Sequence, residues 1–240
     1  MSAAIVGRTV HRPAGPWTPA VHALLRHFES VAFDGAPRAI DVRGGVEVVS
    51  YVDGERSYDT ADDIVFAVGR LVRSMHDAQD GFARPGDAHW QALPNAVAGD
   101  EVICHNDLLG GNVLFRAGRP AAFIDWELAA PGPRVVDLVA PASYWVPLRP
   151  DADAARHGVP TDRRRERLRL LLDGYGLANR SGFLDLVASV WRSWRDAYSL
   201  WGGRERRERW SEAYDAGRCD SIDANLAWLE EHRTEVEAWL

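Results

Sequence analysis

The chain has 240 residues, of which 46% are hydrophobic and 26% are charged, a balance that is ordinary for a globular protein. Its net charge of −7 argues against a nucleic-acid-binding protein that relies on neutralising phosphates. No apolar stretch is long enough to span a bilayer, and no signal peptide is visible. We therefore expect a cytoplasmic protein of one large domain or two lobes, with no nucleic-acid or membrane partner.

Two features of the composition bear on chemistry. The sequence contains no lysine, so arginine supplies every basic side chain other than histidine. Arginine binds phosphate well, but its guanidinium is larger than an ammonium group and is forked. The two cysteines, Cys104 and Cys219, do not have the spacing of a metal-binding or redox motif. Cys104 lies in an apolar run and is expected to be a buried small hydrophobic residue.

The N-terminal residues predict a strand followed by a helix. Ile5 to Val10 is expected to form a short strand that Gly7 interrupts, and it leads to Arg12. Thr18 to Val31 has apolar residues at helical spacing, with Thr18 as the expected N-cap.

A hairpin and a longer helix are expected next. Gly44 and Gly45 separate two apolar runs, which predicts strands over residues 38–42 and 46–52 joined by a two-residue turn. Residues 60–78 carry apolar side chains along one side and predict an amphipathic helix. A proline-containing loop over residues 81–99 then leads to the most informative part of the chain.

Residues 102–127 hold the densest group of side chains that could act in catalysis or bind a metal ion. Three apolar runs predict short strands, and Asp107, Asn112 and Asp125 stand at or near their ends. This arrangement would bring the three side chains into one cleft. Two oxygen ligands and one free carboxylate are what magnesium-dependent phosphoryl transfer requires. A turn rich in Asn, Asp and Gly is the simpler alternative, but it does not account for the three-part pattern.

The remaining residues predict mainly helices. These are expected over residues 138–145, 163–175 and 182–201, with a loop over residues 147–162 and a last helix capped by Ser221. Alternating charges over residues 204–209 predict a solvated helix face. The last helix carries four acidic residues, Glu230, Glu231, Glu235 and Glu237. We interpret them as solvated side chains rather than as a site for a cationic acceptor.

The helix expected over residues 182–201 carries an aromatic stripe. Its members recur every three or four residues, and they are Trp191, Trp194, Tyr198 and Trp201. Such a stripe is more typical of a helix face that packs into a core than of a platform on which a ligand stacks. We therefore expect these four side chains to belong to the core.

The motif resembles a known family. His105-Asn106-Asp107, followed after four residues by Asn112, matches the kinase pattern H-x-D-x-x-x-x-N, and Asp125 stands where protein kinases carry D-F-G. The wording HND…GNVLF…FIDWE resembles the aminoglycoside phosphotransferase and choline kinase-like family of small-molecule kinases. The similarity is strong over residues 102–148 and weak over most of the remaining chain.

The resemblance implies a fold and a set of roles. The fold would be α+β and protein-kinase-like, with a trimmed small sheet lobe in residues 1–53 and a larger, mainly helical lobe in residues 54–240. Asp107 would be the catalytic carboxylate, and His105 would brace its loop. Asn112 and Asp125 would hold Mg²⁺, and ATP or GTP would donate the phosphoryl group.

A further aspartate, Asp137, has two interpretations. Family members carry an aspartate at a comparable place, where it braces the catalytic region. Alternatively, Asp137 is a residue that the dipole favours at the start of a helix. The sequence does not decide between the two.

Nucleotide contacts are expected in the small lobe. The family uses a lysine on a strand to hold the phosphates, so here Arg12 is the candidate and Glu29 its candidate helix partner. A surface cation and a solvated helix residue are the simpler alternatives for these two. Ser50, Tyr51 and Val52 would form the hinge whose backbone pairs with a purine, or they simply end a strand. No glycine-rich hairpin precedes Arg12.

Two hypotheses of function follow. The first is a phosphotransferase that transfers the γ-phosphate of a nucleoside triphosphate to a hydroxyl of a small molecule, with Asp107 orienting that hydroxyl. The second is a kinase-like binding or immunity protein of weak or no activity, resembling trifolitoxin immunity factors. The intact set of Asp107, Asn112 and Asp125 favours catalysis, whereas the missing lysine and hairpin favour binding. The acceptor, the choice of ATP or GTP and the oligomeric state stay open.

Overall fold

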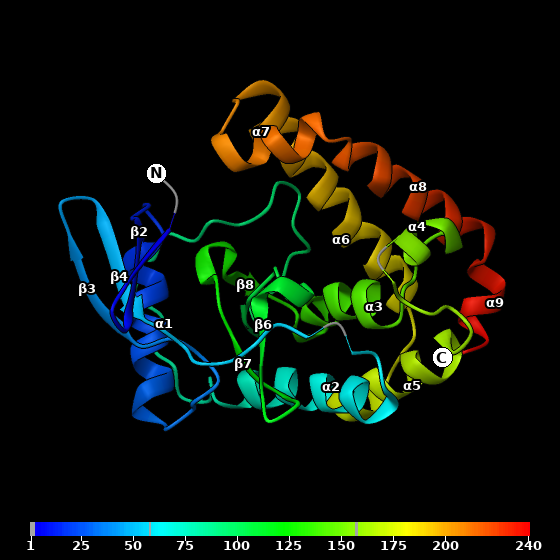
Figure 1. Ribbon diagram of the computed structural model, residues 1–240, viewed down its shortest axis with the longest axis horizontal. Helices are drawn as coiled ribbons and strands as arrows, with labels where there is room; N and C mark the ends of the chain where they lie inside the picture. The colour runs from blue at the N-terminus through cyan, green and yellow to red at the C-terminus, as the bar shows by residue number, and fades with distance from the viewer. Residues whose placement is uncertain (1–2, 58, 157) are drawn as a thin grey trace.

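A small antiparallel sheet and one helix lie at one end of the molecule, and helices form most of the other end (Figure 1). The computed structural model describes residues 3–57, 59–156 and 158–240. The strands are β1 (Ala4–Val6), β2 (Thr9–Pro13), β3 (Ala39–Arg43), β4 (Val46–Ser50), β5 (Val102–Cys104), β6 (Val113–Arg116), β7 (Arg119–Phe123) and β8 (Ala130–Gly132). The helices are α1 (Thr18–Ser30), α2 (Asp62–Asp77), α3 (Val139–Trp145), α4 (Asp151–Arg156), α5 (Arg164–Tyr175), α6 (Phe183–Ala197), α7 (Glu208–Asp215), α8 (Arg218–Glu231) and α9 (Arg233–Glu237).

The N-terminal sheet has the strand order β1-β2-β4-β3, and each neighbouring pair is antiparallel. The prediction of one interrupted strand over residues 5–10 is therefore wrong, because two separate strands form there. Gly7 has a positive φ of 59°, which lets the chain reverse direction and makes β1 and β2 a hairpin. The hairpin at Gly44 and Gly45 forms as predicted.

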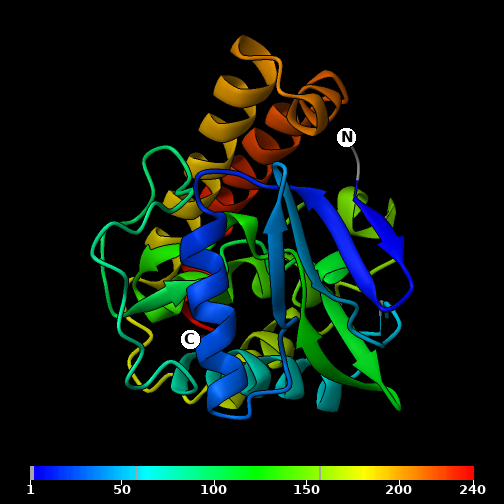
Figure 2. The same cartoon turned by 90° about the vertical axis from the view of Figure 1, so that its left-hand side faces the viewer.

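Helix α1 packs beside this sheet (Figure 2). Its apolar face is buried, with Val21, Leu24 and Leu25 at most 1% exposed. The helix begins one residue earlier than a Thr18 cap would require, because Thr18 is itself helical and its hydroxyl accepts a hydrogen bond from the Gly15 amide at 2.9 Å. Trp17 occupies the capping position instead.

The small sheet encloses a buried ionic network. Arg12 on β2 donates through Nε to Glu47 on β4, and the Arg12 side chain is only 15% exposed. His22 on α1 lies 3.0 Å from the other carboxylate oxygen of Glu47. Burial opposes ionisation of Glu47, but its hydrogen bonds to His22 and Arg12 outweigh that cost and lower the pKa of the carboxyl. The strand arginine therefore has a strand glutamate as its partner.

The predicted pairing of Arg12 with Glu29 is wrong. Glu29 lies near the end of α1, where its carboxylate contacts Arg38 at 2.5 Å and is 43% exposed. The distance along α1 explains this, because the residue that faces Arg12 and Glu47 is His22, and Glu29 lies seven positions, or about two turns, further along nearly the same side of the helix. Glu47 takes over the role that the sequence had assigned to the helix.

The larger part of the molecule is held together by close helix packing. Helices α2 and α5 approach so closely that a Cβ atom on Gly69 would lie 2.2 Å from the Leu171 carbonyl oxygen. The chain between these helices carries β5–β8, which stand between the small sheet and the helices in Figure 1. The family-like two-part architecture is confirmed, whereas the exact division after Asp53 stays a prediction.

Three predictions for the helical part need correction. The expected loop over residues 147–162 contains the short helix α4. The expected helix over residues 182–201 ends at Ala197 and continues as a π-helical segment, Tyr198–Arg204. The last long helix begins at Arg218, so Ser221 lies inside α8 and does not cap it.

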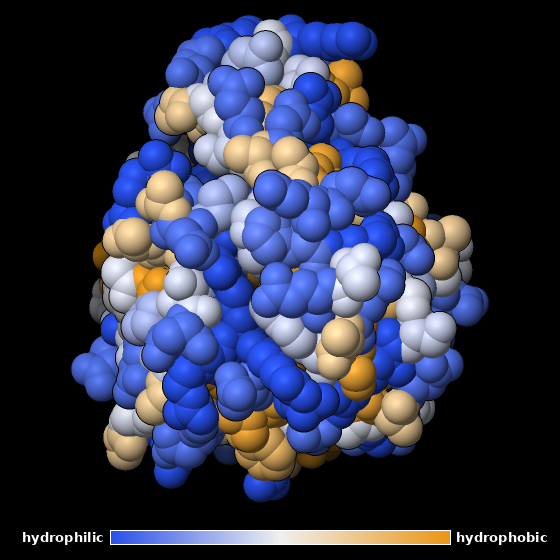
Figure 3. Space-filling view, turned by 90° about the vertical axis from the view of Figure 1, so that its right-hand side faces the viewer, coloured by the Kyte–Doolittle hydropathy of each residue, from blue (hydrophilic) through white to orange (hydrophobic). Residues whose placement is uncertain are grey.

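Figure 3 shows the outer face of the helical part. Hydrophilic residues cover most of it, and hydrophobic residues lie there in small separate groups. Within the described ranges, no helix combines the length and apolar character needed to cross a bilayer.

The ionic network in the small sheet predicts two different costs of losing a glutamate. Glu47→Ala removes the buried partner of Arg12 and His22 and should lower the free energy of unfolding by about 3 kcal/mol. Glu29→Ala breaks a pair that is about half exposed and should cost less than about 1 kcal/mol. Urea unfolding of both variants measures this, and equal losses would contradict the assignment of Glu47 as the partner of Arg12.

Candidate active site

The loop after β5 is fixed by one buried carboxylate. Asp137, which is 1% exposed, accepts hydrogen bonds from the backbone amides of His105 and Asn106, both at 2.8 Å. It also contacts His76 Nε2 at 3.0 Å. Asn106 has a φ of 65°, a conformation that an asparagine tolerates better than most residues. Of the two interpretations of Asp137, the structure supports bracing of the loop.

His76 links this loop to helix α5. Its ring is fully buried, and its Nδ1 lies 2.9 Å from the hydroxyl of Tyr175. Because a carboxylate only accepts, His76 Nε2 donates to Asp137, and Nδ1 makes its hydrogen bond with the Tyr175 hydroxyl. A chain of buried polar groups therefore runs from α5 through α2 to the loop.

His105 points inward rather than into the site. Its Nε2 donates to the Ile124 carbonyl oxygen at 3.0 Å, and its Nδ1 accepts from the Asp107 amide at 3.3 Å. Burial lowers the pKa of the imidazole, so the neutral ring is favoured. The Trp126 ring lies 4.6 Å away. These contacts give His105 the structural part that the resemblance implied.

Asp107 is the carboxylate that the loop presents. Asn112 donates from Nδ2 to the Asp107 carboxylate at 2.9 Å and to its backbone carbonyl at 2.8 Å. Burial raises the pKa of Asp107 to about 7, with a further contribution from the nearby charge of Asp125. A carboxyl group with that pKa can accept a proton near neutral pH.

Asp125 lies between two arginines. Its Oδ1 contacts Nη1 of Arg12 at 2.7 Å, and its Oδ2 contacts Nη1 of Arg209 at 3.3 Å. The backbone of Asp125 is left-handed, with φ 67° and ψ 64°, a costly conformation that clusters at functional sites. Arg209 also contacts Glu127 at 2.8 Å, and burial raises the pKa of that carboxyl.

The donors present fit a magnesium ion. Asn112 uses its Nδ2 on Asp107, so its amide oxygen is the atom left to act as a ligand. Asp125 adds a carboxylate, and Mg²⁺ takes hard oxygen donors and few protein ligands. Across the described residues there is no group of three or more His, Cys, Asp and Glu side chains that would hold a metal alone. The small donor set suits an ion that shares its coordination with phosphates and water.

A hollow of about 200 Å³ adjoins Asp107. Helices α6 and α7 supply most of its lining, which includes Trp194, Tyr198, Arg209 and Trp210. The Trp194 and Trp210 rings stack with centroids 5.8 Å apart. The prediction that the aromatic stripe is entirely core is therefore wrong for Trp194 and Tyr198. Trp191 and Trp201, each 6% exposed, are buried as expected.

The predicted hinge is only partly free for a nucleotide base. The Ser50 amide donates to the Arg38 carbonyl at 2.9 Å, and the Tyr51 amide donates to the Arg8 carbonyl at 2.8 Å. These two donors are used within the small sheet and cannot face a purine. Val52 is left as the hinge residue whose backbone remains a candidate.

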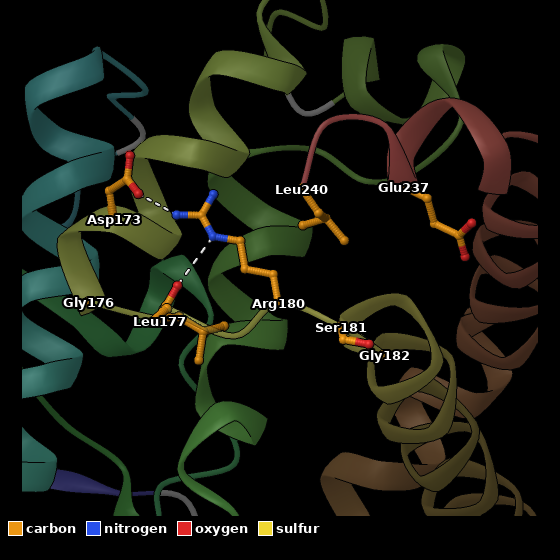
Figure 4. A pocket seen from close by; sticks show the side chains of 9 residues that line it. Asp173, Gly176, Leu177, Arg180, Ser181, Gly182, Glu237 and Leu240 are labelled. Carbon is orange, nitrogen blue, oxygen red and sulfur yellow. Dashed lines mark hydrogen bonds and ion pairs between the residues drawn. The ribbon is translucent and has the colours of Figure 1, made fainter.

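A second and larger hollow, of about 850 Å³, lies away from these carboxylates (Figure 4). Arg180 crosses it and is tied to the Asp173 carboxylate and to the Leu177 carbonyl oxygen. Glu237 and Leu240 from the C-terminal end form the opposite wall. Glu230 and Glu231 end α8, and Glu235 and Glu237 lie in α9, so these acidic residues stand at the end of α8 that is away from α7 (Figure 1) and do not line the hollow at Asp107.

Sequence reasoning missed several residues of the site. Arg209 was assigned to a solvated face, although its side chain reaches Asp125 across 84 positions of the chain. Glu47 and His22 were not singled out at all. A charged residue inside an alternating apolar strand was the one signal for Glu47, since it stands between Val46 and Val48. Nothing in the local sequence signals Arg209.

The raised pKa of Asp107 has a consequence for stability. An aspartate in an unfolded chain loses its proton near pH 3.9, whereas native Asp107 keeps it up to about pH 7. The native state therefore binds more protons between these values, and Asp107 makes the protein less stable as the pH rises through this range.

Asp107→Asn removes this ionisation. Its stability relative to the wild type should increase by about 2 kcal/mol between pH 5 and pH 8. Urea unfolding at both pH values measures the change, with Asp87→Asn at an exposed position as the control. A difference that is the same at both pH values would rule out a raised pKa at Asp107.

Comparisons with known proteins agree with this geometry. The family model described as the phosphotransferase enzyme family (APH) matches residues 86–171, which include the Asp107 loop, Asp125 and Asp137. A trifolitoxin immunity protein from Rhizobium leguminosarum bv. trifolii is 31% identical to this chain. The alignment has 245 positions and covers 98% of this chain and 88% of that protein.

Solved structures share the fold at low sequence identity. A choline/ethanolamine kinase family protein from Mesorhizobium loti has a TM-score of 0.57 at 16% identity, covering 95% of this chain and 88% of its own. A macrolide 2′-phosphotransferase from Brachybacterium faecium has a TM-score of 0.56 at 14% identity, covering 87% and 83%. The chain belongs to the phosphotransferase enzyme family, and its fold is that of aminoglycoside phosphotransferases and choline/ethanolamine kinases.

Proposed function

We propose that the protein transfers the γ-phosphoryl group of ATP or GTP to a hydroxyl group of a small molecule. The observation that carries this proposal is the arrangement of Asp107, Asn112 and Asp125. Asn112 donates to Asp107 through Nδ2, which leaves its amide oxygen for a ligand, and burial together with the nearby charge of Asp125 raises the pKa of Asp107. A proton acceptor beside a set of oxygen ligands suits phosphoryl transfer.

Asp107 acts on the acceptor in this proposal. Its carboxylate accepts a hydrogen bond from the acceptor hydroxyl and takes the proton as the oxygen attacks the γ-phosphorus. The new oxygen–phosphorus bond forms while the bond between the γ-phosphorus and the bridging oxygen breaks, and the nucleoside diphosphate leaves. The hollow beside Asp107, lined by Trp194 and Trp210, is the place for the acceptor.

The remaining residues hold the donor. Arg12 takes the place of the lysine that the chain lacks, and Glu47 keeps its guanidinium in position. Asn112 and Asp125 would hold Mg²⁺, which offsets the negative charge of the phosphates when it is bound. The base would lie against the chain near Val52. A reducing cytoplasm, where the unpaired Cys104 and Cys219 would persist as thiols, is the proposed place of action.

A second candidate function rests on the 31% identical relative. That protein is named for immunity to trifolitoxin, so a role in immunity through binding rather than turnover is the alternative. The short β1–β2 hairpin and the Ser50 and Tyr51 amides engaged within the sheet favour it. We prefer catalysis, because a binding protein has no physical need for a braced loop that presents a carboxylate with a pKa of about 7.

The proposal predicts that magnesium nucleotides stabilise the protein. Mg-ATP or Mg-GTP at about 100 times its dissociation constant should add roughly 2.7 kcal/mol to the free energy of unfolding. Asp125→Ala should abolish the increase, and Asp87→Ala, at an exposed position, should retain it. Thermal melting measures all three proteins, and no increase in the wild type with either nucleotide would refute the proposal.

A further inference from the structure

Arg209 stands between the two halves of the reaction. It lines the same hollow as Asp107, and its Nη1 contacts the carboxylates of Asp125 and Glu127. One guanidinium thus faces both the carboxylate assigned to the acceptor and the carboxylate assigned to the donor. The phosphoryl group passes between these two places when it is transferred.

The contacts of Arg209 leave it able to change partners. Its distance to Asp125 is 3.3 Å, at the long end for an N–H···O hydrogen bond, and its side chain is 48% exposed. Both carboxylate contacts run through Nη1, and in the part of the chain that the structure describes Nε and Nη2 make no further ion pair. These two guanidinium nitrogens, Nε and Nη2, are therefore available to donate to phosphate oxygens.

Arg12 does not have this freedom. Its side chain is 15% exposed, its Nε is held by Glu47, and its Nη1 is held by Asp125 at 2.7 Å. His22 in turn fixes Glu47 at 3.0 Å. Arg12 is thus a rigid positive charge at the back of the site, and Arg209 is the adaptable one at its mouth.

The fold positions the guanidinium of Arg209 directly. Its Cζ lies 5.4 Å from the centre of the Trp210 ring, a distance at which the ring attracts the cation. Helix α7 can carry these two residues so close to the site because Gly202 leaves room, since a Cβ atom there would lie 2.3 Å from the Trp210 carbonyl oxygen. The neighbouring Arg207 stacks on Trp201 at 4.9 Å but pairs with Glu205, outside the site.

From these contacts we propose that Arg209 binds the transferred phosphoryl group, donating from its guanidinium to the oxygens that do not bridge to the rest of the nucleotide. This inference rests on the proposed phosphotransfer. An arginine that donates to these oxygens stabilises the charge on them during transfer. A chain without lysine then uses two arginines that contact different oxygens of Asp125, Arg12 from the sheet and Arg209 from α7.

The test compares two nucleotides that differ by one phosphoryl group. Dissociation constants of Mg-ADP and of the non-hydrolysable Mg-AMP-PNP are measured by calorimetry for the wild type, Arg209→Ala, Arg209→Lys and Arg207→Ala. In Arg209→Ala the affinity for Mg-AMP-PNP should fall by about 10- to 100-fold while that for Mg-ADP changes little. Arg209→Lys should recover part of the loss, and Arg207→Ala should behave as the wild type.

Each other outcome has a definite meaning. Equal changes for both nucleotides in Arg209→Ala would reduce Arg209 to a partner of Asp125 and Glu127 and overturn this inference, while phosphotransfer would stand. A loss of discrimination in Arg207→Ala as large as that in Arg209→Ala would also overturn it, because the effect would then be one of general charge. The guanine pair Mg-GDP and Mg-GMP-PNP is measured in the same way, and binding of none of the four nucleotides by the wild type would overturn the proposed function itself.

Discussion

The site depends on the way one buried carboxylate holds a loop. Asp137 accepts hydrogen bonds from the backbone amides of His105 and Asn106 and from the His76 ring, and it is almost completely excluded from solvent. A charge buried to that degree is stable only when hydrogen bonds replace its hydration. If the loop moved away, the buried Asp137 would lose these hydrogen bonds without gaining water in their place. The loop is therefore fixed, and the carboxylate of Asp107 is in position before a substrate binds. Preorganisation of this kind is what a catalytic group needs.

The absence of lysine shapes the rest of the cleft. A lysine would be one mobile point charge, whereas Arg12 uses different nitrogens for Glu47 and Asp125 and so joins the sheet to the motif. The partner glutamate comes from β4 because Glu47 stands directly opposite Arg12 where β4 pairs with β2. Burial, with a further contribution from the charge of Asp125, raises the pKa of Asp107 and of Glu127, and Arg209 moderates this increase for both groups.

The sequence predicted the strands and loops within one continuous stretch and missed the contacts between segments that are far apart in the chain. The strands and loops around Asp107, Asn112 and Asp125 were foreseen because apolar runs and polar ends alternate locally. Glu29 was mistaken for the partner of Arg12, since the sequence shows that α1 is a helix but not which of its turns lies beside Glu47 on β4. Trp194 and Arg209 were assigned to the core and to solvent because the π-helical segment that redirects the chain before α7 has no simple periodicity. Such features follow from packing between distant segments, which local patterns do not encode.

Release of nucleoside diphosphate tests the central claim, that the braced loop presents Asp107 as a working proton acceptor. The rate is measured with Mg-ATP and Mg-GTP, with water as the acceptor and with a panel of small molecules that carry hydroxyl groups, for the wild type and for Asp107→Asn, together with nucleotide affinity. We expect release by the wild type to fall by about 100-fold or more in the variant, with affinity nearly unchanged. Equal rates in the two proteins, or nucleotide binding by the wild type without any release, would contradict the assignment and favour a kinase-like binding protein.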